Sequence, residues 1–86
     1  MKNVSTSTQV IQNEVVNIIS SIKKVHPDKL LKVRDFTKLE FDILDVVDII
    51  LAVEKTYQLT IPDEVPVYSI DDFVDYIYTQ SMKQAG

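Results

Sequence analysis

The chain has 86 residues, a net charge of −4 at pH 7 and no cysteine, and 45% of its residues are hydrophobic. The lack of cysteine excludes disulfides and thiolate chemistry, and the acidic balance argues against a nucleic-acid partner because phosphate binding needs a basic surface. With only one glycine and three prolines, the chain favours helices over a turn-rich β-sandwich or barrel.

The N-terminus, MKNVSTSTQ, has no apolar run of the kind found in a secretory signal. No segment approaches the ~20 apolar residues of a membrane span. We therefore predict a cytoplasmic protein without a membrane span. A single domain is expected over residues 1–86, with a frayed start over residues 1–8 and an ordered core of about residues 9–80.

A first helix is predicted from apolar residues at helical spacing. Its buried stripe consists of Ile11, Val15, Ile18, Ile19, Ile22 and Val25. His26-Pro27 should end this helix, because the residue before a proline is pushed away from helical angles. His26 is the only histidine, and it is interpreted as a surface residue because no nucleophile pattern accompanies it.

A long link over residues 27–41 follows. A bare loop of this length is uncommon, so its apolar residues are expected to fold back onto the core. These residues are Leu30, Leu31, Val33, Phe36 and Leu39.

The second helix should begin after Asp42, which reads as its N-cap, and end near Tyr57. Asp45 adds negative charge that suits the positive end of the helix dipole. At about 100° per residue the apolar arc of this helix spans roughly 220°, much wider than the ~100° stripe of an ordinary surface helix. The helix is therefore either contacted on several sides, or it presents apolar surface to a partner or ligand.

The segment TIPDE marks a break, and Pro62 is well placed to begin a short helical turn. Ser69 and Asp72 have capping-box spacing for a last helix. The predicted buried face of that helix consists of Ile70, Phe73, Val74, Ile77 and Tyr78, and a loose tail is expected from Thr79. The pattern predicts an all-α, small four-helix bundle with three longer helices, one short helix and a long first loop.

From Asp42 onward the chain resembles the acyl carrier protein family. That family opens its second helix with Asp-Ser-Leu, continues through an acidic helix to Ile-Pro-Asp-Glu, and ends its last helix with Asp-Tyr-Ile. Here Asp42 and Leu44 match the first motif, IPDE stands at residues 61–64 and DYI at residues 75–77. The resemblance covers roughly residues 10–78 and implies a bundle of the acyl-carrier-protein type.

The departure falls on Ile43, which stands where the motif has its serine. In the family that serine hydroxyl carries 4′-phosphopantetheine, whose thiol holds the acyl chain. Isoleucine has no hydroxyl, so no bound cofactor is expected here. The nearest hydroxyls, on Thr37 and Thr56, lie outside the start of the helix.

The resemblance implies a non-catalytic interaction module of fatty-acid or polyketide-type acyl metabolism, docking on enzymes through their basic patches. The predicted partner-binding residues lie on the second helix, and Ile43 is expected to be exposed. They are Asp42, Ile43, Leu44, Asp45, Val46, Asp48 and Glu54.

Two alternatives stay open. The chain could be a functional carrier modified at another hydroxyl, or a small protein that holds an apolar ligand between its helices. No metal site is expected, because the spacing of the acidic residues from Asp63 to Asp75 matches no calcium loop.

Overall fold

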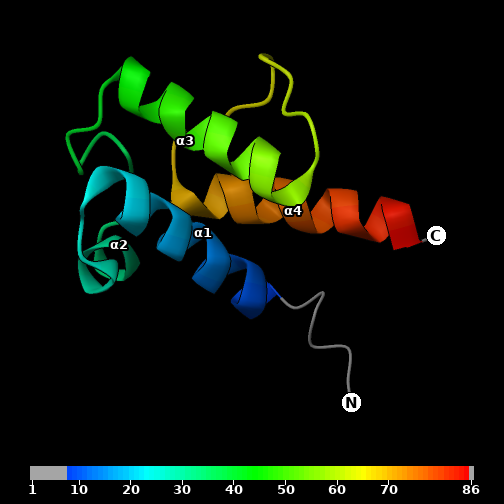
Figure 1. Ribbon diagram of the computed structural model, residues 1–86, viewed down its shortest axis with the longest axis horizontal. Helices are drawn as coiled ribbons and strands as arrows, with labels where there is room; N and C mark the ends of the chain where they lie inside the picture. The colour runs from blue at the N-terminus through cyan, green and yellow to red at the C-terminus, as the bar shows by residue number, and fades with distance from the viewer. Residues whose placement is uncertain (1–7, 86) are drawn as a thin grey trace.

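The computed structural model describes residues 8–85, with side chains to Ser81. Four helices make up this part of the chain, in the order α1 (Thr8–Lys23), α2 (Pro27–Lys32), α3 (Ile43–Tyr57) and α4 (Ile70–Ala85). No named strand occurs among these residues. The all-α, four-helix architecture with one short helix and a long first connection is therefore confirmed (Figure 1).

Helix α1 packs against each of the other three helices. These three helices contact one another less than they contact α1. Its buried face is Ile11, Val15, Val16 and Ile19. Val16 is buried although the sequence did not predict it. Several helices contact α1, so its buried surface is wider than a single stripe. Ile22, predicted as a core residue, is 40% exposed, since it lies in the last turn of α1.

The hydrophobic core is continuous across the helices and the link between α2 and α3. Phe36, from that link, is buried with its ring centroid 5.8 Å from those of both Phe41 and Phe73. The prediction that the link folds back onto the core is confirmed for Leu30, Phe36 and Leu39, which are buried. Leu31 is instead 39% exposed, because it follows Leu30 on α2 and so lies about 100° around the helix from it.

Two backbone hydrogen bonds join the link to the start of α4. The Phe36 N–H donates to the Tyr68 carbonyl and the Ile70 N–H donates to the Arg34 carbonyl, each at 3.0 Å. Arg34 Nη1 also pairs with Asp71 Oδ1 at 2.6 Å. The link is therefore held at both the backbone and the side-chain level, although it is mostly not helical.

The short helix is not where the sequence predicted it. It occupies Pro27–Lys32, where Pro27 takes the first turn and His26 Nδ1 accepts the Asp28 N–H at 3.1 Å. Pro62 begins only a turn, closed by a 3.0 Å bond from the Val65 N–H to its carbonyl. Pro66 follows directly and disfavours helical angles at Val65, so a helix cannot continue there.

The expected loose tail from Thr79 is also wrong, since α4 continues to Ala85. Neither glycine nor proline occurs between Thr79 and Ala85, so nothing in this segment ends the helix. The capping prediction at the other end of α4 is confirmed, because the Asp72 N–H donates to Ser69 Oγ at 3.2 Å. The predicted frayed start lies mainly in residues 1–7, outside the described residues.

Phe73→Ala should lower the free energy of unfolding by about 3–5 kcal/mol, because it removes a fully buried ring that contacts Phe36. Urea denaturation followed by circular dichroism measures the change. Tyr68→Ala is the matched control, since its side chain is 71% exposed, and it should change the free energy by no more than about 0.5 kcal/mol. Equal effects of the two variants would contradict the assignment of the core.

Candidate functional site

Helix α3 begins with a reciprocal cap that fixes the position of its first turn. The Asp45 N–H donates to Asp42 Oδ1 at 2.9 Å, and the Asp42 N–H donates to Asp45 Oδ2 at 3.0 Å. The predicted N-cap at Asp42 is thus confirmed, and Asp45 completes a capping box. Ile43 is the first residue of the helix, held on an ordered turn.

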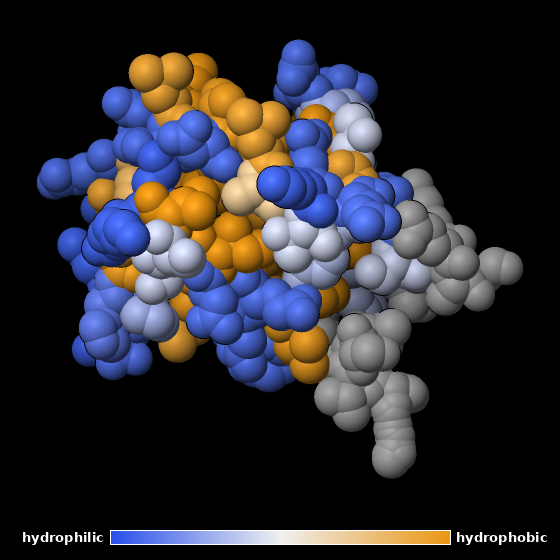
Figure 2. Space-filling view, in the orientation of Figure 1, coloured by the Kyte–Doolittle hydropathy of each residue, from blue (hydrophilic) through white to orange (hydrophobic). Residues whose placement is uncertain are grey.

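The outer face of α3 carries exposed hydrophobic side chains along its length. We call this surface the α3 apolar stripe; it consists of Ile43, Leu44, Val47 and Leu51, which are 77%, 70%, 42% and 58% exposed. Figure 2 shows hydrophobic colour along the edge of the molecule where α3 lies. The expectation that Ile43 is exposed is confirmed. Monomeric proteins seldom expose a contiguous apolar patch without using it.

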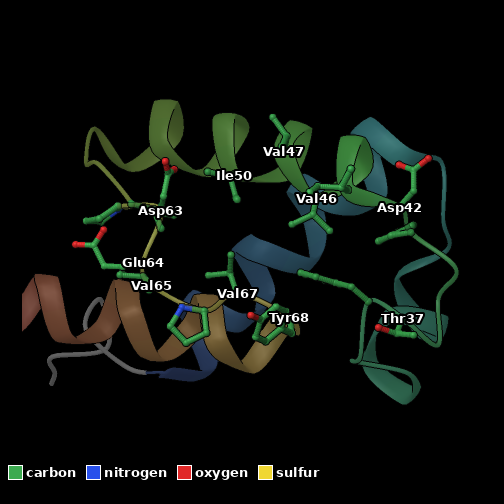
Figure 3. A pocket seen from close by; sticks show the side chains of 16 residues that line it. Thr37, Asp42, Val46, Val47, Ile50, Asp63, Glu64, Val65, Val67 and Tyr68 are labelled. Carbon is green, nitrogen blue, oxygen red and sulfur yellow. The ribbon is translucent and has the colours of Figure 1, made fainter.

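Val46 lies beside the stripe and is less exposed than its members. It is partly buried and lines a groove of about 490 Å³ between α3 and the connection that precedes α4. In Figure 3, Val46 and Ile50 of α3 lie across from Val67 and Tyr68 of the connection. Ile43 and Val47 of the stripe line the same groove, so the stripe and the groove meet along α3.

The two ends of this groove are polar. Asp42 and Thr37 lie at one end in Figure 3, and Asp63 and Glu64 lie at the other. Between them the lining is mainly aliphatic and aromatic, so the groove fits an elongated apolar group better than a charged one.

The acidic residues of α3 form hydrogen bonds and ion pairs with other residues of the same molecule. Lys23 Nζ, at the end of α1, lies 2.7 Å from Asp45 Oδ1 and 3.0 Å from Asp48 Oδ2. The hydrogen bond from Lys23, followed by the one from the Asp42 backbone, lowers the pKa of Asp45 below its ordinary value. The bonds to Asp45 and Asp48 raise the pKa of Lys23 in turn.

Glu54 also has an internal role. Its Oε2 accepts the Ile61 N–H at 2.7 Å, and this bond holds the start of the connection against the end of α3. Glu54 lies 12 residues after Asp42, or roughly 18 Å along the helix. The structure thus groups six of the predicted partner-binding residues at the start of α3 and leaves Glu54 apart; their role in binding stays a prediction.

A second polar contact joins α1 to α3. Tyr57 Oη donates a hydrogen bond to Glu14 Oε1. Burial and the neighbouring Glu14 carboxylate raise the pKa of the Tyr57 hydroxyl well above its ordinary value, so it remains a neutral donor.

Sequence reasoning missed Lys23, Val47 and Leu51 as parts of this surface. Val47 and Leu51 follow Ile43 at four-residue spacing, which is a signal that could have separated the exposed part of the arc from the buried part. No sequence signal indicated Lys23, because it lies 22 and 25 residues from its two partners.

Over the described residues, no group of three or more His, Asp or Glu side chains could hold a metal ion. None of the described helices is long and apolar enough to cross a membrane.

No family model matches the chain. A mitochondrial acyl carrier protein of Dictyostelium discoideum is 35% identical over 60 residues, which cover 70% of this chain and 50% of that protein. One from Neurospora crassa is 29% identical over 72 residues, covering 79% and 54%. An acyl carrier protein of Buchnera aphidicola is 29% identical over 76 residues, covering 85% and 96%. The chain spans about half the length of the two mitochondrial relatives and nearly all of the bacterial one.

Lys23→Gln should raise the pKa of Asp45 toward its ordinary value, because the largest cause of its lowering is removed. A lowered folded-state pKa means that the bonds of Asp45 stabilise the fold above the unfolded pKa and that this contribution is lost as pH falls through the folded one. The variant should therefore lose less stability between neutral and acid pH. NMR titration of the Asp45 carboxyl carbon measures the shift.

The matched control is Lys55→Gln, which removes an exposed lysine of α3 that forms no ion pair among the described residues. It should leave the Asp45 titration unchanged. An unchanged Asp45 pKa in Lys23→Gln would show that Lys23 does not hold this carboxylate in solution.

Proposed function

We propose that this chain, a relative of the acyl carrier proteins, is a carrier-like interaction module of acyl metabolism that does not itself carry 4′-phosphopantetheine. The observation that carries the proposal is Ile43, which is the first residue of α3 and is 77% exposed. Its aliphatic side chain contains no oxygen to which the pantetheine phosphate could be esterified. The residues at this position therefore do not fit the cofactor that the family carries.

Because Ile43 is exposed, attachment of the cofactor would be prevented by the missing hydroxyl and not by restricted access. A modifying enzyme could reach the start of α3, which the Asp42–Asp45 cap holds in place, but it would find no nucleophile there. An isoleucine at this position adds little to the core of its own molecule. Contact with a partner is the role that best fits such a side chain.

The proposed docking surface is the N-terminal half of α3, with an acyl-metabolism enzyme as the partner. Ile43 and Leu44 would supply apolar contact, while Val46 supports the turn from the groove side. Asp42 and Asp48 keep exposed carboxylates that could steer a basic patch on the enzyme toward this end. Because Lys23 pairs with Asp45 and Asp48, we expect weaker steering than a fully acidic helix would give.

The same proposal treats residues 1–86 as one acyl-carrier-protein-like domain without catalytic activity of its own. The cytoplasmic location stays a prediction from the sequence. The two mitochondrial relatives carry a different location in their names.

Incubation with a phosphopantetheinyl transferase and coenzyme A, followed by intact mass spectrometry, tests this proposal. The wild-type chain should gain no mass. Ile43→Ser should gain one pantetheine arm if the surrounding surface is still recognised, because it restores a hydroxyl on the first turn of α3. Val47→Ser is the matched control, since it places an exposed hydroxyl one turn further along and should not be modified.

Attachment of a pantetheine arm to the wild-type chain would overturn the proposal. Peptide mapping would then decide between the exposed hydroxyls of Thr37 and Thr56, which belong to the alternative of a functional carrier modified elsewhere. Failure of Ile43→Ser to be modified would mean that recognition has been lost along with the serine.

A second candidate function, binding of an apolar ligand, is favoured by the groove beside α3. Its volume of about 490 Å³ lies in the range of small-molecule sites, and its middle is apolar. Native mass spectrometry should then detect a copurified apolar molecule that is lost on denaturation. Val46→Trp should exclude it by filling the groove, whereas Leu51→Trp, which lies outside the groove, should retain it. A chain that purifies without any such molecule and binds no added fatty acid would count against this function.

A further inference from the structure

The groove beside α3 has carboxylates at both ends and no cation in its lining. Asp42 lies at one end, and Asp63 and Glu64 lie at the other (Figure 3). Among the described residues that line the groove, none is a lysine, arginine or histidine. A ligand with an anionic head group would therefore meet negative charge without a counter-ion, whereas a cationic head group would meet opposite charge.

The two ends differ in how far their carboxylates are already bonded. Asp42 Oδ1 accepts the Asp45 N–H at 2.9 Å, as part of the cap of α3. Asp63 and Glu64 are exposed, and their side chains form no hydrogen bond or ion pair with another described residue. The end at Asp63 and Glu64 therefore has two carboxylates that can pair with a ligand.

Backbone contacts hold these two carboxylates beside the groove. Asp63 and Glu64 take the central positions of the turn over residues 62–65, whose ends are joined by a backbone hydrogen bond of 3.0 Å. Just before the turn, the Ile61 N–H donates to Glu54 Oε2 at 2.7 Å, which fixes this part of the connection against α3. The position of the turn at the end of the groove is thus set without using either carboxylate.

The apolar part of the groove is longer than a lysine side chain. Ile43 and Ile50 both line it, and they lie seven residues apart, or about 10 Å along α3. A lysine carries its ammonium on a stem of only four carbons. With a volume of about 490 Å³, the groove suits a longer aliphatic chain, so the cation that fits it belongs to a free amphiphile and not to a lysine of a partner protein.

We propose that the groove binds a long-chain aliphatic amine, with its ammonium beside Asp63 and Glu64 and its chain lying toward Ile43. This inference rests on the second candidate function, binding of an apolar ligand, and names the class of that ligand. Burial of the aliphatic chain supplies affinity for any head group. The two carboxylates then favour a cation, so a fatty acid of the same length binds more weakly and a neutral alcohol lies between them.

Isothermal titration calorimetry of the full chain with decylamine, decanol and decanoate tests this order. The three ligands share one chain length and differ in the charge of the head group near neutral pH; each is used below its micellar concentration. At low salt, decylamine should bind at least about fivefold more tightly than decanoate. About 1 M salt should narrow this difference, because the Debye length falls to ~3 Å.

A charge-neutral double variant tests the two carboxylates. Asp63→Asn combined with Glu64→Gln should weaken decylamine binding, strengthen decanoate binding and leave decanol unchanged. Asp28→Asn combined with Asp75→Asn is the matched control, since it changes the net charge equally at two exposed residues outside the groove. The control should keep the preference for the amine.

A second pair of variants tests whether the amine lies in the groove. Val46→Trp should abolish binding of all three ligands by filling the groove, and Leu51→Trp, on the exposed outer face of α3, should leave their affinities unchanged. Circular dichroism checks that every variant remains folded.

Equal affinities for decylamine and decanoate would overturn the proposal, and so would tighter binding of decanoate. An amine preference that both double variants reduce alike would also overturn it, because net charge and not the groove would then be responsible. Each of these results leaves the binding of an apolar ligand standing. If none of the three ligands binds, this proposal fails together with that candidate function, while the test with the transferase and coenzyme A remains independent of both.

Discussion

The packing of α1 against the three other helices is the constraint on which the rest of the structure depends. Val15 and Ile19 are completely buried in it, and they contribute to one core with residues from α3, α4 and the long link. The contact also has two polar parts, Lys23 with Asp45 and Asp48, and Tyr57 with Glu14. Because α1 sets the position of α3 in this way, it also decides which side of α3 remains exposed.

That orientation separates α3 into surfaces with different chemistry. Ile49 and Val53 are buried in the core, and Val46 and Ile50 line the groove beside it. Leu44 and Leu51 of the stripe lie outside both, whereas Ile43 and Val47 lie at the edge of the groove. A helix that is apolar around most of its circumference can therefore belong to a small domain in which only part of that helix is covered.

The acidic residues of α3 show why a residue pattern alone is a poor guide to a docking surface. Asp42 and Asp45 cap the helix, Asp45 and Asp48 bind Lys23, and Glu54 holds the backbone of Ile61. Each of these bonds satisfies a charge or a backbone N–H of the same molecule. These carboxylates therefore have roles inside their own molecule that account for their positions without a partner.

The sequence by itself determined the helical class, the cap at Asp42, most of the buried faces of α1 and α4 and the absence of a hydroxyl at Ile43, because periodicity, capping and side-chain chemistry act over a few residues. It did not place the short helix, because a proline can begin either a helix or a turn. At Pro62 the segment remains a turn because Pro66, four residues later, disfavours helical angles at Val65. Only the tertiary structure decided that Val46 faces a groove and that Lys23 pairs with two aspartates, and it confirmed the expected exposure of Ile43. Those outcomes depend on which elements meet in space, and contacts across more than 20 residues leave no periodic signal in the chain.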